Sequence, residues 1–156
     1  MSPGIFLLFA LLVAVFFFYL TGTKRASQHS SAIPDPVGVI HDTGQYSQAI
    51  VGESHYQNAL ELASGGRTKD SAEKYLQAHL VLEDSNPHDS LAVRVDIKGQ
   101  TVGYLSRKIA REYRNRTREA GHSHLEGVCN AVIRGGWDRG PKEQGYFGVW
   151  LDLPTV

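Results

Sequence analysis

The chain has 156 residues, enough for one domain of ordinary size and an accessory segment. Its 16 Lys and Arg residues balance its 16 Asp and Glu residues, which argues against a bulk polyelectrolyte binder but leaves room for a local basic face. The single cysteine, Cys129, argues against a disulfide framework and against a paired-cysteine metal site. We therefore expect Cys129 to be a buried structural thiol in a reducing compartment.

An apolar run near the start of the chain predicts a membrane segment. Residues 5–20 read IFLLFALLVAVFFFYL, without a charge or a strongly polar group. This run is slightly shorter than the roughly 20 residues of a spanning helix, and its neighbours can extend it. We therefore assign residues 1–23 to a transmembrane helix. The run lacks a basic start and a clear cleavage site, which favours an uncleaved anchor over a signal peptide.

Two basic residues predict the orientation of this anchor. Lys24 and Arg25 follow the apolar run directly, and no basic side chain precedes it. The positive-inside rule then predicts a single-pass protein of the cell membrane whose C-terminal domain is cytoplasmic. Residues 24–45 are rich in Ser, Gly, Thr, Gln and Pro without an apolar period, which is typical of a flexible linker. The folded domain is expected to comprise residues 46–156.

The first part of this domain is expected to mix a strand with helices. Residues 46–52 predict a first strand, and residues 55–63 are compatible with a helix that Ser54 caps. A Gly-rich loop over residues 64–70 separates this helix from a second helical stretch at residues 71–76.

The middle of the domain carries the strongest strand signals. Residues 78–83 and 91–97 alternate between apolar and polar side chains on either side of a polar turn. Gly99 and Gln100 predict a tight turn into a further strand over residues 101–105.

The last part predicts a helix followed by two strands. Ser106 is a suitable N-cap, and Gly121 is a suitable stop for the helix between them. Strands are expected over residues 125–133 and 146–153, with Trp137 as the exposed aromatic of the Gly-rich loop between them. Many short strands with two interposed helices predict a small, closed or nearly closed β-barrel.

The segment LVLEDSNPHDSLAVRVDIKGQTVGYL, residues 80–105, resembles the core of the HIRAN domain. This domain is a small β-barrel found in DNA-remodelling and repair proteins and as a stand-alone bacterial module. The resemblance covers about residues 46–153. It implies a mainly β, OB- or SH3-like barrel with added helices, which binds single-stranded DNA at free 3′ ends and is not an enzyme.

Asn86 and Asp89 of the polar turn are the first candidate site residues. Taken alone, Asn-Pro-His-Asp is ordinary turn chemistry, because Asx side chains bond to their own backbone and Pro87 fixes φ. The resemblance implies that Asn86 and Asp89 also line a pocket for the 3′ end of single-stranded DNA. A carboxylate accepts a hydrogen bond from a 3′-hydroxyl and repels a 3′-phosphate, so the pocket would detect ends rather than sequence.

His55 and Tyr56 are the second candidates. The resemblance places them where DNA-binding members carry two aromatic residues, and both can stack on a base at roughly 1–3 kcal/mol per base. Ser54 stands where a basic residue is expected, and it cannot pair with a phosphate. The alternatives are that Tyr56 is a core aromatic and that His55 is an exposed residue at a helix N-terminus.

The basic helix after Ser106 supplies the third set of candidates. Its cations are opposed only by Glu112 and Glu119, and such a run is most often a solvated face. Contact with DNA phosphates or with anionic lipid headgroups are the functional alternatives. The candidate phosphate contacts are Arg107, Lys108, Arg111 and Arg114.

The sequence offers no other chemistry. His122 and His124 are the closest histidine pair, and no carboxylate or cysteine completes a ligand set with them, so we expect no metal and no cofactor. Two alternatives to DNA binding stay open. The first is a protein-interaction module that has lost the DNA site, and the second is a module that binds anionic membrane surfaces.

Overall fold

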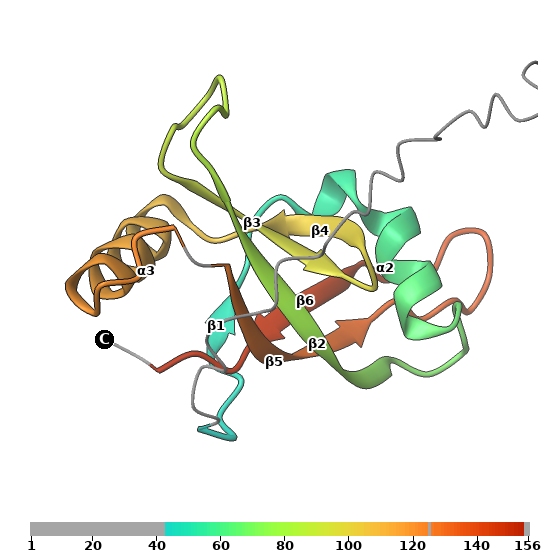
Figure 1. Ribbon diagram of the computed structural model, residues 1–156. Coiled ribbons are helices and arrows are strands. Elements are labelled where there is room, and N and C mark those ends of the chain that lie inside the picture. The colour runs from blue at the N-terminus through green and yellow to red at the C-terminus, as the bar shows by residue number, and fades with distance from the viewer. Residues whose placement is uncertain (1–42, 125, 155–156) are drawn as a thin grey trace, which may run out of the picture. The chain divides into compact units, whose positions relative to one another are not determined.

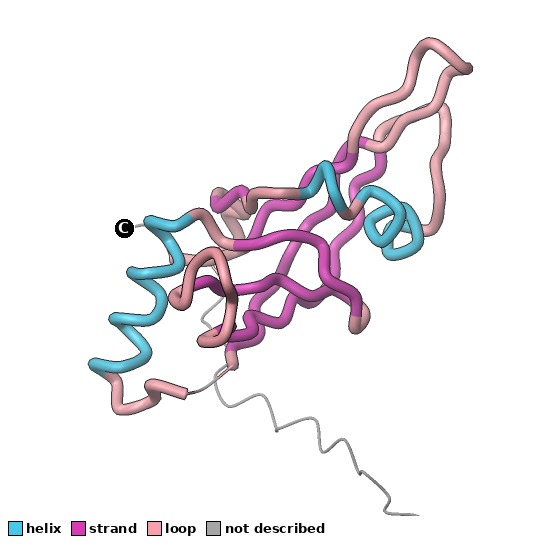
Figure 2. The backbone as a smooth tube through the Cα atoms, turned by 90° about the horizontal axis from the view of Figure 1, so that it is seen from above, coloured by secondary structure: helices cyan, strands magenta, loops and turns pink. Residues whose placement is uncertain are grey.

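The computed structural model of the chain describes residues 43–124 and 126–154. The predicted anchor, residues 1–23, lies outside this range, as does the predicted linker up to residue 42. Among the residues that are described, none of the helices has both the length and the hydropathy that crossing a bilayer requires. The described residues form one curled antiparallel sheet with helices α2 and α3 at opposite ends of it (Figure 1, Figure 2).

Six strands build the sheet in the order β1-β6-β5-β2-β3-β4. The longest, β2, pairs with β5 over Ala72–Leu80 and with β3 over Ala78–Glu83, so it runs through both halves of the sheet. The strands are β1 (Gln48–Ala49), β2 (Ala72–Glu83), β3 (Ala92–Ile97), β4 (Gln100–Tyr104), β5 (Gly127–Gly135) and β6 (Phe147–Leu151).

A short backbone bridge joins the two edges of this sheet. β1 pairs with β6, and two residues later Val51 bridges to Tyr104 of β4 through backbone hydrogen bonds of 2.8 and 2.9 Å. Gly103 allows this approach, because a Cβ at that position would lie 2.7 Å from the carbonyl oxygen of Val51. The curled, mainly β sheet with helices agrees with the OB-like class that was expected.

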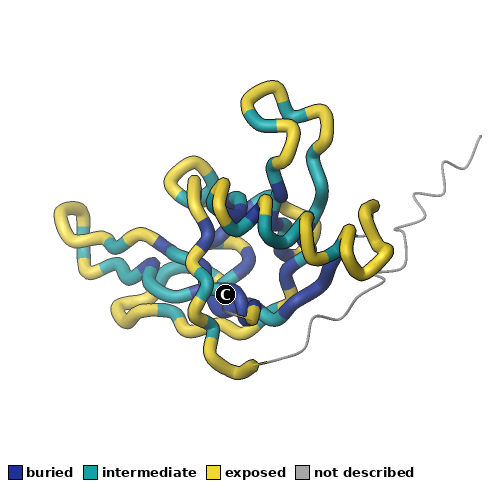
Figure 3. Tube along the Cα trace, turned by 90° about the vertical axis from the view of Figure 1, so that its left-hand side faces the viewer, coloured by how far each residue is buried: buried dark blue, intermediate teal, exposed yellow. Residues whose placement is uncertain are grey.

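The core fills the inside of the curl, as the buried segments in Figure 3 show. Strand alternation turns one side of each strand inward, and α2 (Gln57–Ser64) adds Leu60 and Ala63 from outside the sheet. Cys129 is buried as expected, and burial raises the pKa of its thiol to about 12. The largest fully buried apolar side chains are Phe147, Leu60, Leu80, Ile97, Ile133 and Leu151.

Two predictions of helical structure are wrong. Residues 71–76 do not form a helix, because Ala72–Leu76 is the first part of β2 and pairs with β5. Its helix-forming residues are overridden by this long-range pairing. Ser54 does not cap α2 either. It lies inside a single 3₁₀ turn, η1 (Glu53–His55), and Tyr56 occupies the N-cap position without a side-chain capping bond.

The basic helix begins and ends where the sequence predicts. α3 comprises Arg107–Glu119, and the Ser106 hydroxyl accepts a hydrogen bond from the Ile109 amide at 3.4 Å. Gly121 follows the helix with φ of 81°, in the left-handed region that glycine tolerates. Ala110 packs against the core, and the cationic side chains of Arg107, Lys108 and Arg111 are exposed on the outside of the helix.

Asp152 holds the first described residues of the domain, 43–45, in place. Its carboxylate is fully buried, and it accepts hydrogen bonds from the amides of Thr43 at 3.1 Å, Gly44 at 2.9 Å and Gln45 at 3.3 Å. The Thr43 hydroxyl is a further partner of the same carboxylate. Residues 43–45, which the sequence assigns to the linker, are therefore held against the folded domain.

We expect Gly103→Ala to lower the free energy of unfolding by about 1–3 kcal/mol, because the added methyl group overlaps the Val51 carbonyl and Ile50. Urea unfolding measures the change, and Gln100→Ala, at an exposed position of the same strand, is the control. Equal stability of the two variants would show that the edges of the sheet do not need this close approach.

We expect Asp152→Asn to lower the free energy of unfolding by about 2–3 kcal/mol, since one of its two acceptor oxygens becomes an NH₂ group that faces amide donors. The exposed Asp70→Asn is the matched control, and thermal or urea unfolding is the measurement. An unchanged Asp152→Asn variant would contradict the fastening role of this carboxylate.

Candidate nucleic-acid interface

Asn86 uses both ends of its side-chain amide inside the β2–β3 loop. Its Nδ2 donates to Oε2 of Glu83 at 2.7 Å, and its Oδ1 accepts from the backbone amides of His88 at 2.9 Å and Asp89 at 3.3 Å. The side chain thereby sets the shape of the turn. The ordinary turn chemistry considered for this sequence is thus present at Asn86.

Asp89 joins the turn to α3. Its Oδ1 accepts from the Leu91 amide at 3.0 Å, and its Oδ2 lies 3.3 Å from Nη1 of Arg111 and 3.7 Å from Nε of Arg107. The hydrogen bond from the Leu91 amide and the two guanidinium groups lower the pKa of Asp89 against a smaller opposing effect of desolvation. The carboxylate is therefore ionised at neutral pH, and 16% of the side chain is exposed.

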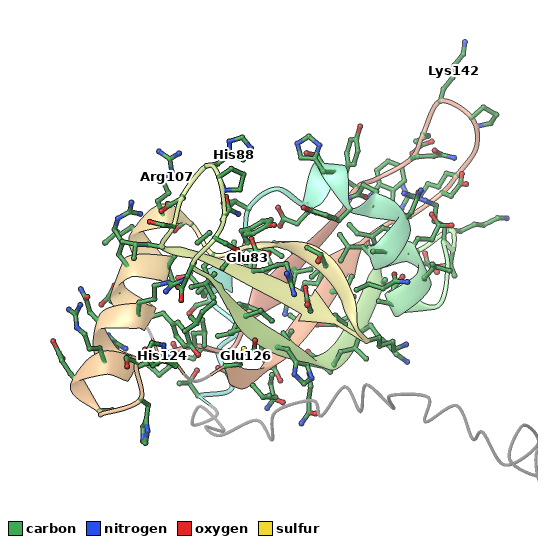
Figure 4. All side chains as sticks on the ribbon, turned by 45° about the horizontal axis from the view of Figure 1, so that its top comes forward. Glu83, His88, Arg107, His124, Glu126 and Lys142 are labelled. Atoms are coloured by element: carbon green, nitrogen blue, oxygen red, sulfur yellow. The ribbon has the colours of Figure 1, made fainter. Side chains whose placement is uncertain are left out.

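The first turns of α3 present cations beside this carboxylate. The side chain of Arg107 is 79% exposed and that of Arg111 is 45% exposed, and Lys108 is an exposed residue between them. Figure 4 shows Arg107 and His88 next to each other at the outer end of the β2–β3 loop, with Glu83 at its base. The loop and the start of α3 thus form one surface.

Arg114 lies deeper and holds the loop in place. Its guanidinium donates to the carbonyl oxygens of Leu91 at 3.0 Å and Ala92 at 2.9 Å, and it pairs with Asp84 at 2.6 Å. The side chain is only 14% exposed. Of the four predicted phosphate contacts, Arg114 therefore has all three guanidinium nitrogens engaged within the domain, whereas Arg111 has Nη1 engaged.

Tyr56 and His55 sit beside β4, because the Val51 bridge places the chain there just before η1. His55 is exposed, whereas Tyr56 is half-buried, with its ring centroid 6.5 Å from that of Tyr104. Burial, Tyr56 and the carboxylate of Glu83 together raise the pKa of Tyr104 to about 12. Tyr56 is thus neither wholly interior nor remote from the turn.

Glu83 connects the aromatic pair with the turn. Its Oε1 accepts from Nη1 of Arg94 at 2.6 Å, while its Oε2 accepts from Asn86. Desolvation acts to raise the pKa of Glu83, but the hydrogen bonds from Asn86 and Arg94 outweigh it and the pKa is lowered. Arg94 also binds both carboxylate oxygens of Asp96 at 2.9 Å, which fixes the guanidinium against β3.

The structure brings most of the predicted residues into one region and adds three that were not predicted. Glu83, Arg94 and Tyr104 lie between the turn and Tyr56, and no charge pattern in the sequence singles them out. The alternation of β3 does predict that Arg94, between buried Val93 and Val95, points away from the core. The exposed cationic groups at the start of α3 are Lys108 and the two partners of Asp89, Arg107 and Arg111.

The loop between β5 and β6 carries a separate aromatic and basic group. Trp137 is not the exposed aromatic that was expected, since it is half-buried against Gly145 and beneath the guanidinium of Arg139 at 5.1 Å. Tyr146 is 77% exposed instead. Figure 4 shows Lys142 of this loop far from His88 and Arg107.

Comparison with protein-family models matches residues 43–135 to the HIRAN domain. The chain belongs to the HIRAN domain family. The match begins at Thr43, one of the residues bound to Asp152, and it includes the β2–β3 loop, α3 and the Tyr56–Tyr104 pair. No curated protein matches the chain, and no solved structure matches it.

We expect Arg114→Ala to lower the free energy of unfolding by about 1–3 kcal/mol, because the carbonyl groups of Leu91 and Ala92 lose their donors. Lys108→Ala, on the exposed face of the same helix, is the matched control and should stay within about 0.5 kcal/mol of the unmodified chain. Urea unfolding separates the two, and equal stabilities would show that Arg114 does not hold the loop.

Proposed function

We propose that this HIRAN domain binds single-stranded DNA and recognises a free 3′ end at the β2–β3 loop. The observation that carries this proposal is the juxtaposition of an ionised, partly exposed carboxylate, Asp89, with the cations of Arg107 and Arg111. A 3′-terminal nucleotide offers the complementary groups, which are a hydroxyl donor and a phosphodiester anion one sugar away.

The carboxylate supports discrimination between termini. Oδ1 of Asp89 is occupied by the Leu91 amide, but Oδ2 has only the long contacts to two guanidinium groups and retains acceptor capacity. A 3′-hydroxyl can donate to this oxygen. A 3′-phosphate would bring further negative charge to the same place without a matching donor, and the pair would repel.

The cations supply affinity that does not depend on sequence. Where the turn contacts the first turns of α3, the cations of Arg107, Lys108 and Arg111 outnumber the one carboxylate of Asp89, so this contact carries a positive excess although the whole chain is neutral. Base stacking on Tyr56 and His55 would add roughly 1–3 kcal/mol per well-stacked base. Ser54 supplies no phosphate contact, so the affinity is expected to be modest.

A second candidate function rests on the exposed cations along α3. Arg116 pairs with Glu112 at 3.2 Å, and its side chain remains 47% exposed, so positive groups extend beyond the turn. If residues 1–23 anchor the chain and the domain faces the cytoplasm, as the sequence predicts, this helix could lie against anionic headgroups at about 1 kcal/mol per basic residue near the surface.

The test is a titration of the full chain in neutral detergent with matched single-stranded oligonucleotides that end in a 3′-hydroxyl or a 3′-phosphate. We expect the hydroxyl terminus to bind roughly 10-fold tighter, the effect of one charge-assisted hydrogen bond. Asp89→Ala should remove the preference, and Asp70→Asn should keep it. Equal binding of both termini by the unmodified chain would contradict end recognition.

The same titration distinguishes the second function. Lys108→Ala should reduce the salt slope of DNA binding by about 0.7 if the side chain contacts one phosphate of a single strand. Vesicles that contain an anionic phospholipid serve as the competing ligand. Binding to vesicles without binding to either oligonucleotide would favour a membrane-surface module over a DNA-binding one.

A further inference from the structure

We infer that Glu83 is the positioning residue of the end-recognition loop, because its ionised carboxylate fixes which way the side-chain amide of Asn86 points. The inference rests on the proposed function. In it, Glu83 does not contact DNA but sets the shape of the loop that distinguishes the two termini. The carboxylate interacts with Asn86 of the turn, with Arg94 of strand β3 and with Tyr104 of the aromatic pair. A change at Glu83 therefore alters the contacts of all three residues.

The hydrogen-bond pattern around Asn86 requires an acceptor at position 83. The Asn86 oxygen is taken by two backbone amides of the turn, so its NH₂ group must face Glu83. A carboxylate accepts at both oxygens, and here one serves Asn86 while the other serves Arg94. A neutral side chain of the same shape cannot do both, since an amide has one acceptor oxygen.

Glutamine at this position would therefore face a conflict between two donors. If its oxygen stays with the Arg94 guanidinium, its NH₂ group meets the NH₂ group of Asn86. Asn86 can relieve this clash by turning its amide over, which removes the acceptor from the amides of His88 and Asp89. The turn then loses the hydrogen bonds from the His88 and Asp89 amides, and the second of these holds the backbone of the residue that contacts α3.

Glu83 also reaches the stacking side of the site. The Tyr104 phenol interacts with both Glu83 and Tyr56. The carboxylate is thus the group shared by the end-reading loop and the aromatic platform. The phosphate contacts, in contrast, come from α3 and do not pass through Glu83.

The experiment compares Glu83→Gln with Glu73→Gln in the full chain in neutral detergent. Glu73 lies at the other end of the same strand and is 58% exposed. It accepts a hydrogen bond from the Tyr75 hydroxyl at 2.9 Å and lies 3.5 Å from Arg134, so its contacts do not involve the turn and it is a matched control. Each protein is titrated with the 3′-hydroxyl and 3′-phosphate oligonucleotides at two salt concentrations. The side-chain amide resonances of Asn86 are followed by NMR, and thermal unfolding shows that each variant is folded.

We expect Glu83→Gln to bring the ratio of affinities for the two termini close to one, to leave the salt slope unchanged and to shift the Asn86 side-chain resonances. Glu73→Gln should behave as the unmodified chain does. An unchanged affinity ratio or unshifted Asn86 resonances in a folded Glu83→Gln variant would overturn the positioning role. If Glu83→Gln does not fold, Glu83→Ala tests the same contact by removing both acceptor oxygens, and unchanged discrimination with unshifted Asn86 resonances in that variant would also overturn it.

The two proposals fail in different ways. Absence of DNA binding by the unmodified chain overturns the proposed function, whatever the variants do. The Asn86 resonances then still decide whether Glu83 orients the amide, because that measurement needs no DNA.

Discussion

The backbone bridge between Val51 and Tyr104 is the constraint on which the rest of the arrangement depends. It joins the two edges of the sheet, and it is possible because Gly103 has no side chain. The turn η1 follows this bridge directly in the chain. His55 and Tyr56 therefore lie beside β4. The bridge that joins the edges of the sheet therefore also places the aromatic pair of the candidate site.

Charge is arranged around the β2–β3 loop so that each acidic group has a partner from another element. Asp89 forms an ion pair with Arg111 of α3, Asp84 with Arg114, and Glu83 with Arg94. Such pairs contribute little to stability where they are exposed, but several together fix the position of the β2–β3 loop. The cations that remain exposed, at the first turns of α3, are then held at a defined place relative to the turn. A neutral chain can in this way present a local binding surface.

The sequence was informative where local rules decide the structure. The β2–β3 and β3–β4 connections and the caps of α3 follow from turn residues, alternation and N-cap chemistry, and the structure confirms them. Contacts between residues that are distant in the sequence determine the features that were not predicted. Residues 71–76 look helical in isolation but pair with β5, and Arg114 resembles its neighbours although its donors bind the loop. Asp152 and Glu83 could not be distinguished from other acidic residues, because burial and hydrogen-bond partners are properties of the assembled fold.

Turn formation and ligand recognition are not alternatives for Asn86 and Asp89. A recognition group is most effective when its position is set before the ligand arrives, since ordering it on binding costs free energy. Asn86 uses its whole amide to shape the turn, and Asp89 uses one oxygen to continue it. The remaining oxygen of Asp89 is thereby presented at a fixed distance from two guanidinium groups. The same hydrogen bonds that make this an ordinary Asx turn hold the second oxygen of Asp89 beside Arg107 and Arg111, so the turn geometry supports the recognition role that we propose.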